Sequence, residues 1–419
     1  MGVNKIRLHF PKPVIQGKIH LDGSKSISNR VLIMLALAED KPAGLEHLST
    51  SRDSQLMQNL LGSREEVLDT GAAGTTYRFL TAYLATRGRK VILTGSERMK
   101  QRPIGELVST LNAMGAGIEY VEKEGFPPLR FPGTPLKQIA RRISIRSTIS
   151  SQYISALLMI APCLPLGLEL QLVGEVISRP YIEMTLAMMD HFGIRSAWEN
   201  DTITIEPQPY VSKPLFVEGD WSAASYYYSL AAIAEEAELD LYGISNHSLQ
   251  GDAAIAEIGK LFNIQTTWHP DHVNLKKLLG SLPKSFEWDF IKCPDLAQTV
   301  IALCAATGVH GVFTGLQTLR IKETDRIAAM KTELKKLQVP FYRLPAKMSK
   351  ASKIEYHMVE GKAVFDHTPV FATYEDHRMA MSLAPLSLIH PIEIEEPEVV
   401  AKSYPGFWKD LQSLGCEIY

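Results

Sequence analysis

Apolar residues surround all sides of six predicted helices. Each helix follows a short turn of small polar residues, and helices that are apolar all round are typical of a protein core. The six segments are GSKSISNRVLIMLALA, TGAAGTTYRFLTAYLA, STISSQYISALLMIA, GDWSAASYYYSLAAIA, CPDLAQTVIALCAA and YEDHRMAMSLAPLSL, beginning near residues 23, 70, 147, 219, 293 and 374. The pattern predicts a unit of about 70 residues repeated six times, with a short first copy.

A second pattern recurs between these helices. Several amphipathic helices close with an apolar pair, then Gly or Asn, and then a strand. The closing residues are Gly115, Gly193, Asn263 and Gly415, with looser copies at Gln338 and Gly62. Gly and Asn are expected there because the residue after a helix often adopts a left-handed conformation. Helices and strands in every unit predict an α/β fold.

Length, composition and charge narrow the class of protein. A chain of 419 residues is too long to fold around one hydrophobic core, so two domains of about 200 residues are expected. Apolar residues make up 45% and charged residues 21% of the chain, as in soluble globular enzymes. The formal net charge of −2 argues against a partner such as nucleic acid or a membrane surface.

The cysteines and the apolar stretches indicate a cytoplasmic protein. Cys163, Cys293, Cys304 and Cys416 have neither a metal-ligand nor a disulfide-framework spacing. The N-terminal residues lack the apolar core of a signal peptide. The most apolar stretch, 153–173, is interrupted by prolines, so it predicts a buried helix followed by the strand LELQLV rather than a membrane span.

The start of the first buried helix is a candidate anion site. Lys25, Ser26 and Arg30 bring two cations and a hydroxyl to a helix N-terminus, where free N–H groups and the helix dipole favour anions. The pattern suits a phosphate or a carboxylate. A capped helix with solvated charges explains the same residues equally well.

Three further charged clusters lie beside predicted helices. Arg98, Lys100 and Arg102 precede Pro103, which is predicted to occupy the first helical position. In a second cluster, KETDR, the lysine and the arginine are expected to lie four residues apart on one helix face, where they could bind an anion. The alternative is a surface helix whose charges only form salt bridges with one another. The third cluster contains Asp376, His377 and Arg378, directly before a buried helix; a lone histidine there is more often structural.

Eight motifs together resemble one enzyme family. GSKSISNR, RPIG, SSQY, SRPY, EGDWSAASY, KETDR, DHRMAM and AKSYPGFW follow the order of the signatures of the 5-enolpyruvylshikimate-3-phosphate synthases. The resemblance implies a transferase of the shikimate pathway, in aromatic amino acid biosynthesis. Such an enzyme moves the enolpyruvyl group of phosphoenolpyruvate to the 5-hydroxyl of shikimate 3-phosphate and releases phosphate.

The resemblance also implies the architecture. Two inside-out α/β domains are expected, each a threefold repeat with buried parallel helices and outer sheets. The domains are expected at 1–22 plus 218–419 and at 23–217, with the active site in the cleft between them.

Site residues follow from the resemblance position by position. The shikimate 3-phosphate set is Lys25, Ser26, Arg30, Ser150, Ser151, Gln152, Ser178, Tyr181, Asp295 and Lys322. The phosphoenolpyruvate set is Lys25, Gly74, Arg102, Gln152, Arg326, Arg378 and Lys402.

The expected catalytic groups are Asp295, Glu323 and Lys25. Asp295 is assigned to orient and deprotonate the 5-hydroxyl, and Glu323 to protonate C3 of phosphoenolpyruvate. Lys25 is assigned as an electrostatic partner that could also transfer a proton. Two highly anionic substrates would repel each other, so the cations of the two sets are needed to offset that charge.

Two positions depart from the family pattern. The glycine loop usually reads Gly-Asn-Ala-Gly-Thr, but Ala72 replaces the asparagine here, and Thr318 stands where many members have asparagine. We expect weaker binding of phosphoenolpyruvate, or of its analogue glyphosate, as a result. The segment between Asp53 and Gly71 is also shorter than usual, by about a hairpin.

Two alternatives remain open at this point. A related transferase acts on a UDP-sugar, but it usually carries a reactive cysteine in the first half of the chain, and no cysteine precedes Cys163. A noncatalytic sugar-phosphate-binding relative would be expected to lose Asp295, Glu323 or Lys25. No cofactor and no metal are expected, because the sequence has no dinucleotide, Walker or histidine-rich metal motif. A monomer acting on small molecules is expected.

Overall fold

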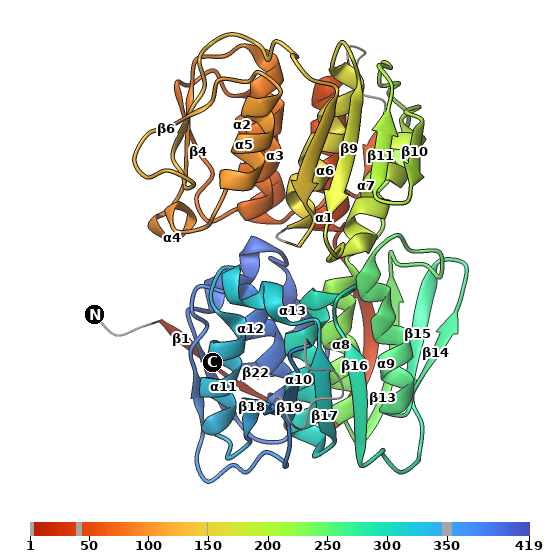
Figure 1. Cartoon of the computed structure of the whole chain (residues 1–419). Helices are drawn as coiled ribbons and strands as arrows, with labels where there is room; N and C mark the ends of the chain where they lie inside the picture. The colour runs from red at the N-terminus through yellow and green to blue at the C-terminus, as the bar shows by residue number, and fades with distance from the viewer. Residues whose placement is uncertain (1–3, 39–43, 149, 346–353) are drawn as a thin grey trace. The chain divides into compact units, whose positions relative to one another are not determined.

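The chain divides into two compact units. A computed structural model describes residues 4–38, 44–148, 150–345 and 354–419 (Figure 1). The terminal unit contains Met1–Asp22 and Glu218–Tyr419, and the central unit contains Gly23–Val217. Each unit encloses its own cluster of buried apolar side chains.

Three four-stranded sheets belong to the terminal unit. The first contains β20 (Val370–Phe371), β21 (Ile392–Glu395), β1 (Lys5–His9) and β22 (Glu417–Ile418). The second contains β14 (Ile264–Trp268), β15 (His272–Lys277), β13 (Glu236–Tyr242) and β2 (Val14–His20). The third contains β16 (Ser285–Asp289), β17 (His310–Thr314), β19 (His357–Val359) and β18 (Phe341–Arg343).

The central unit has two four-stranded sheets and one shorter sheet. The first contains β10 (Ser196–Glu199), β11 (Thr202–Ile205), β9 (Leu168–Val173) and β8 (Arg142–Arg146). The second contains β4 (Val67–Asp69), β5 (Ile92–Thr94), β7 (Leu129–Arg130) and β6 (Glu119–Tyr120). Within the described ranges the last sheet is the pair β12 (Leu215–Phe216) and β3 (Leu45–Glu46).

One pairing pattern is common to all five four-stranded sheets. Each has a parallel pair, such as β13 with β2 or β16 with β17, followed by two antiparallel strands. The short sheet keeps only the parallel pair. The sixfold repeat and its short first copy are thus confirmed, because α2 (Arg52–Gly62) leads directly to β4 where another repeat would place a hairpin.

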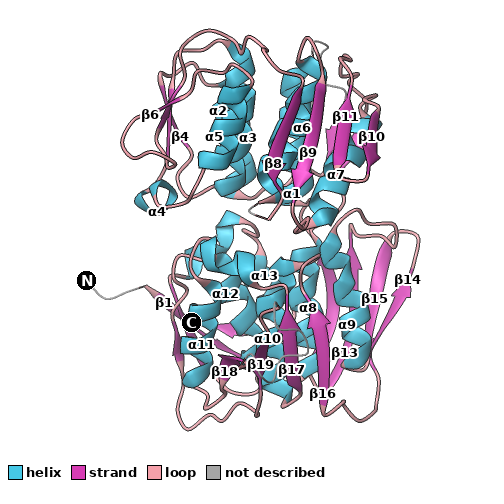
Figure 2. Cartoon of the chain, in the orientation of Figure 1, coloured by secondary structure: helices cyan, strands magenta, loops and turns pink. Residues whose placement is uncertain are grey.

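Six buried helices form the two cores. They are α1 (Lys25–Leu37), α3 (Gly74–Arg87), α6 (Ser151–Ile160), α8 (Trp221–Ile233), α10 (Ala297–Thr307) and α12 (His377–Leu383). These starts match the six predicted turns. Within each unit the helices lie inside and the strands outside (Figure 2), which is the inside-out α/β fold expected from the sequence.

The remaining helices lie around these six. Besides α2, the described residues contain α4 (Glu97–Lys100), α5 (Gly105–Ala113), α7 (Arg179–His191), α9 (Ile255–Leu261), α11 (Arg326–Lys335) and α13 (Phe407–Ser413). Short 3-10 helices are η1 (Ala161–Cys163), η2 (Gly251–Ala254), η3 (Pro294–Leu296), η4 (Gln317–Ile321), η6 (Ala384–Leu388) and η7 (Pro397–Lys402).

The predicted helix ends are largely confirmed. Positive φ angles occur at Gly115, Gly193, Asn263, Gln338 and Gly415. The prediction for position 62 was wrong, because that glycine is the last residue of α2 and the chain leaves the helix through an extended residue instead. The strand LELQLV is confirmed as β9.

Three findings concern chemistry outside the site. Within the described ranges, no helix is long and apolar enough to cross a membrane. The same part of the chain contains no group of three or more His, Cys, Asp and Glu residues suited to hold a metal ion. All four cysteines lie in it and none forms a disulfide; Cys163 is exposed and the other three are buried.

Candidate active site

In the terminal unit a buried arginine collects three carboxylates. Arg326 is 2% exposed. Its guanidinium donates to Asp376 at 2.7 Å, to Asp295 at 3.0 Å and to Glu323 at 3.0 Å. Although burial opposes its charge, these carboxylates raise the pKa of Arg326. The arginine therefore fixes the positions of both predicted catalytic acids relative to each other.

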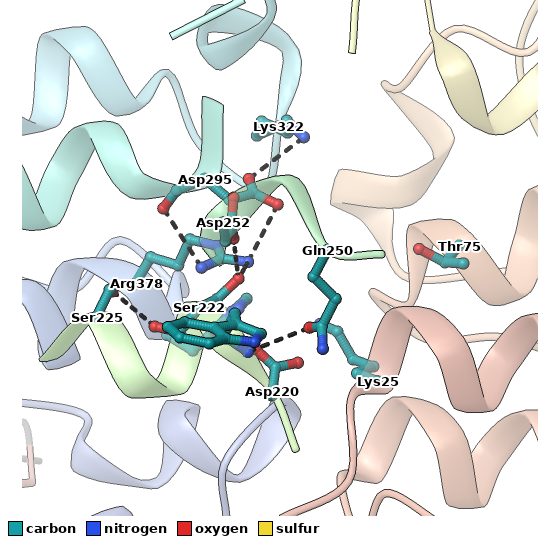
Figure 3. Close-up of polar contacts among 12 residues, drawn as sticks. Lys25, Thr75, Asp220, Ser222, Ser225, Gln250, Asp252, Asp295, Lys322 and Arg378 are labelled. Atoms are coloured by element: carbon teal, nitrogen blue, oxygen red, sulfur yellow. Dashed lines mark hydrogen bonds and ion pairs between the residues drawn. The ribbon is translucent and has the colours of Figure 1, made fainter. Parts of the chain in front are cut away.

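Asp295 lies among cations from three elements (Figure 3). Arg378 of α12 contacts it at 3.1 Å, Arg326 of α11 at 3.0 Å, and Lys322, the residue after η4, at 3.6 Å. Burial alone would raise the pKa of Asp295, but the three cations together hold it well below its usual range. The carboxylate is therefore ionised at neutral pH.

Glu323 has a different environment from Asp295. One carboxylate oxygen accepts from Arg326, and the other lies 3.2 Å from the Lys402 ammonium. Lys402 is the last residue of η7 and the lysine of the motif AKSYPGFW. Six predicted site residues thus meet in one cluster, namely Asp295, Lys322, Glu323, Arg326, Arg378 and Lys402.

The prediction that one helix carries both basic residues of KETDR was wrong. Lys322 is extended, and α11 starts only at Arg326, because Asp325 caps it by accepting from the amides of Ile327 and Ala328 at 3.1 Å. The turn places both cations on Asp295 from different directions. Burial lowers the pKa of Lys322, and the Asp295 charge opposes this shift.

Capping explains why the other charged triplet lies at its helix start. Asp376 is fully buried and accepts from the Arg378 amide at 2.9 Å while binding Arg326. Its carboxylate therefore joins the starts of α11 and α12. His377 is buried as well, with its Nδ1 3.8 Å from Asp376.

In the central unit, Lys25 opens α1. Ser24 caps the helix, and the Lys25 ammonium lies 3.4 Å from Asp53 of α2, with 14% and 9% of the two side chains exposed. Ser26 is half-buried beside it. The lysine is therefore held at the helix start rather than extended into solvent.

Arg30 is buried more deeply than its motif suggested. Its guanidinium donates to the Thr185 hydroxyl at 2.7 Å, to the Ser155 hydroxyl at 3.2 Å, and to the Ser26 and Tyr181 carbonyls. Burial lowers the pKa of Arg30 to about 10. The cation is thus held by neutral oxygens, and it connects α1 to α6 and α7.

Two guanidinium groups face the start of α3. A Cβ at Gly74 would lie 2.6 Å from Arg102 Nη1 and 2.6 Å from Arg78 Nη1. Arg78 also donates to the Gly74 carbonyl at 2.9 Å. Nearby, the side-chain amide of Gln152 donates to the Thr75 hydroxyl at 2.9 Å. A side chain at position 74 would therefore displace both guanidinium groups from the helix start.

The predicted serines lie at two other helix starts. The Ser150 hydroxyl caps α6 by accepting from the backbone amide of Gln152 at 3.3 Å, and Ser151 is the first residue of that helix. Ser178 precedes α7 with a left-handed φ of 56° and makes no side-chain capping bond there. Tyr181 follows within the first turn of α7. Pro103 was predicted to begin a helix, but α5 starts only at Gly105.

Sequence reasoning missed several participants. Arg78 lies one helical turn after Gly74, a spacing that could have identified it. Asp53 faces Lys25 from a helix 28 positions later in the chain. Ser222 of α8 accepts from Arg378 and donates to Asp252 of η2. These last pairs depend on the tertiary fold and have no local signal.

Comparison with known proteins identifies relatives of this chain. The family model for EPSP synthase (3-phosphoshikimate 1-carboxyvinyltransferase) matches residues 58–411. A Bacteroides fragilis (strain YCH46) protein named 3-phosphoshikimate 1-carboxyvinyltransferase is 48% identical over 406 residues, covering 96% of each chain. An Aliivibrio fischeri (strain ATCC 700601 / ES114) protein of the same name is 35% identical, covering 97% of this chain and 98% of the relative.

A solved structure shows the same fold. EPSP synthase from Acinetobacter baumannii superposes with a TM-score of 0.76 at 21% identity, covering 99% of both chains. The family match spans most of the chain, and the relatives match it over nearly their full length. The chain therefore belongs to the EPSP synthase family.

Proposed function

We propose that this protein transfers the enolpyruvyl group of phosphoenolpyruvate to the 5-hydroxyl of shikimate 3-phosphate and releases phosphate. The observation that carries the proposal is the cluster in which Arg326 holds Asp295 and Glu323 among Lys322, Arg378 and Lys402. It supplies two carboxyl groups for proton movement and four cations for anionic substrates. Membership of the family makes this reaction the expected one.

The addition and the elimination each need two proton transfers. In the addition step, the 5-oxygen bonds to C2 of phosphoenolpyruvate, the hydroxyl proton leaves and C3 gains a proton. In the elimination step, C3 loses a proton, the bond from C2 to the phosphate oxygen breaks, and the departing phosphate takes up a proton. We assign the hydroxyl proton to Asp295 and the C3 proton to Glu323, because the two groups have different partners.

The resting charges favour substrate binding over early proton transfer. Before substrates bind, the cations keep Asp295 ionised and weakly basic. An anionic substrate that engages Arg378 and Lys322 would offset part of that positive field. The carboxylate would then become a stronger base when the hydroxyl is in place.

The central unit supplies the remaining expected contacts. Gly74, Arg102, Lys25 and Gln152 are proposed for phosphoenolpyruvate, supported by the two guanidinium groups at Gly74. Shikimate 3-phosphate is proposed to contact the helix starts at positions 25–26, 150–152 and 178–181, which offer hydroxyls and amides suited to phosphate. We propose that both sets contact one pair of substrates in an interdomain site.

Two further properties remain predictions from the sequence. The scattered cysteines predict a cytoplasmic protein, and a monomer is expected. The UDP-sugar alternative is not favoured, since the relatives reported above carry the other name. A noncatalytic role is not favoured either, because Lys25, Asp295 and Glu323 all have charged partners in the site.

A phosphate-release assay with both substrates tests the proposal. The unmutated protein should release phosphate only when both substrates are present. Asp295→Ala and Glu323→Gln should each lower kcat by about 100-fold or more, since each removes a proton-transfer group.

A matched control separates catalysis from the loss of an ion pair. Glu323 and Arg326 lie three residues apart, as do Glu257 and Lys260, whose side chains are 64% and 60% exposed. Glu257→Gln makes the same substitution in that exposed pair and should leave kcat unchanged. If the unmutated, folded protein releases no phosphate, the proposed reaction is wrong.

A further inference from the structure

A buried carboxylate without an assigned role is connected to Arg378 through Ser222. Asp252 belongs to η2 and is 3% exposed. One of its oxygens accepts from the Ser222 hydroxyl; the other, Oδ1, has no hydrogen-bond partner in the described part of the chain. A half-satisfied buried carboxylate is costly, so its presence calls for a function.

The directions of the hydrogen bonds join Asp252 to the proposed base. Arg378 Nη2 donates to Ser222 Oγ at 3.3 Å and lies 3.1 Å from Asp295 Oδ2. A guanidinium can only donate, so the Ser222 oxygen accepts from it and the hydroxyl hydrogen points to Asp252. One arginine nitrogen is therefore held between Ser222 and Asp295, as Figure 3 shows.

The surrounding charges determine the protonation of Asp252. Asp220 at the start of α8, Asp295 of η3 and Arg378 of α12 all act on it, and the Cys293 thiol lies close enough to feel its charge. Burial and then repulsion by Asp295 raise the pKa of Asp252 to about 7. The carboxyl therefore holds a proton most of the time only below about pH 7.

A proton on Asp252 preserves the positive charge of the site. Lys322, Arg326, Arg378 and Lys402 face the three carboxylates of Asp295, Glu323 and Asp376. Among these seven groups the balance is one positive charge, and an ionised Asp252 would add a negative charge beside Arg378 and Asp295. A neutral Asp252 can accept from Ser222 without drawing Arg378 away from Asp295 or from an anionic substrate.

We propose that Ser222 and Asp252 are a positioning pair that fixes the Arg378 guanidinium against Asp295, with Asp252 acting in its neutral form. The inference rests on the proposed function, since Asp295 and Arg378 are its reacting and substrate-binding groups. Neither Ser222 nor Asp252 exchanges a proton with substrate. Their effect passes through the orientation of Arg378.

A pair of serines on one helix gives a matched first test. Ser222 and Ser225 both lie in the first half of α8, but the Ser225 hydroxyl donates to the Ser222 carbonyl at 2.6 Å. Within the described ranges it makes no hydrogen bond to Arg378 or Asp252. Ser222→Ala should lower kcat/KM for phosphoenolpyruvate by about 10- to 100-fold through misplacement of Arg378. Ser225→Ala should leave kcat/KM unchanged.

Substitutions at Asp252 test the neutral form. Asp252→Ala should reproduce the Ser222→Ala defect, and the double variant should be no worse than either single variant, because the pair acts as a unit. Asp252→Asn keeps an oxygen that accepts from Ser222 but carries no charge. It should recover most of the activity lost in Asp252→Ala.

Thermal unfolding against pH gives a readout independent of catalysis. The pKa of Asp252 is raised on folding from 3.8 to about 7, so its stabilising contribution is complete below about 3.8 and is lost as pH rises through about 7. The melting temperature of the unmutated protein should therefore fall relative to that of Asp252→Asn between pH 4 and pH 8.

The outcomes separate this inference from the proposed function. Absence of phosphate release by the unmutated protein overturns the proposed function itself. With an active unmutated protein, Ser222→Ala kinetics equal to those of Ser225→Ala overturn the positioning pair. Asp252→Asn as inactive as folded Asp252→Ala, or a melting difference that does not change with pH, overturns the neutral form.

Discussion

At position 74 the absence of a side chain leaves room for two cations. The guanidinium groups of Arg78 and Arg102 approach to 2.6 Å of the place where a Cβ would lie. Real Cβ atoms do not tolerate such contacts, so any larger residue must displace both arginines. Because Arg102 is a predicted phosphoenolpyruvate ligand, we predict that this glycine affects substrate binding rather than backbone conformation.

Gly74→Ala should therefore weaken phosphoenolpyruvate binding. The added methyl group shifts both guanidinium groups, and a displacement of about 1 Å at a charged contact can cost as much as about 100-fold. We expect KM for phosphoenolpyruvate to rise, while KM for shikimate 3-phosphate changes less. Steady-state kinetics with each substrate varied in turn measures the difference.

Gly62→Ala is the control for adding a methyl group to a glycine. Nothing lies within 4 Å of a Cβ at position 62, which ends α2. The change should stabilise the protein by about 0.4–1 kcal/mol by restricting the unfolded chain and should leave both KM values as they were. Equal kinetic effects at positions 62 and 74 would contradict the role given to Gly74.

The turn before α12 shows how one element supports another. Tyr374 and Glu375 both have left-handed φ angles, of 55° and 56°, a conformation that costs non-glycine residues about 1 kcal/mol or more each. The buried Glu333 of α11 holds the turn by accepting from the Tyr374 hydroxyl at 2.6 Å and the Ala372 amide at 3.1 Å. Helix α11 thus fixes the segment that delivers Arg378.

Tyr374→Phe should destabilise the protein and lower activity. Loss of a hydrogen bond to a buried carboxylate costs about 1–3 kcal/mol, and the turn would no longer hold α12 firmly. We expect a lower urea midpoint for unfolding together with a reduced kcat/KM for phosphoenolpyruvate.

A half-buried pair of the same chemistry, outside this turn, provides the comparison. Tyr342 donates to Glu360 at 3.0 Å between β18 and the end of β19. Tyr342→Phe should change the unfolding free energy by less than about 0.5 kcal/mol, because water replaces the lost bond. The support given by Glu333 would be disproved if both variants unfolded at the urea midpoint of the unmutated protein.

At the scale of the whole molecule, the predicted site residues are divided between two units. Lys25, Gly74 and Arg102 belong to the central unit, whereas the cluster around Arg326 belongs to the terminal unit. The chain passes between the units at residues 22–23 and again at 217–218. If both sets contact the same substrates, ligand binding must hold the two units in one arrangement.

Small-angle scattering tests that requirement. Shikimate 3-phosphate at saturation should reduce the radius of gyration, because closure excludes water from the reacting groups. Inorganic sulfate at the same ionic strength is the control and should leave the curve unchanged. Identical scattering with and without shikimate 3-phosphate would count against an interdomain site.

The sequence by itself determined the repeat, the buried helices and most helix ends. These depend on local rules: an apolar helix must lie inside, and Gly or Asn lowers the cost of a left-handed helix end. The sequence also contains the motifs from which the family was predicted. The exceptions were local too, since Gly62 continues a helix and the Asp325 cap starts α11 after Lys322.

Only the tertiary structure decided which charges meet. Arg326 contacts carboxylates 31 and 50 positions away, and Arg378 reaches Ser222 across 156 positions. Periodicity carries no information about such pairs, because it reports which face is buried but not what lies opposite. Asp252 shows the difference: its sequence environment is that of an ordinary turn, and its pKa and proposed role arise from burial beside Asp295.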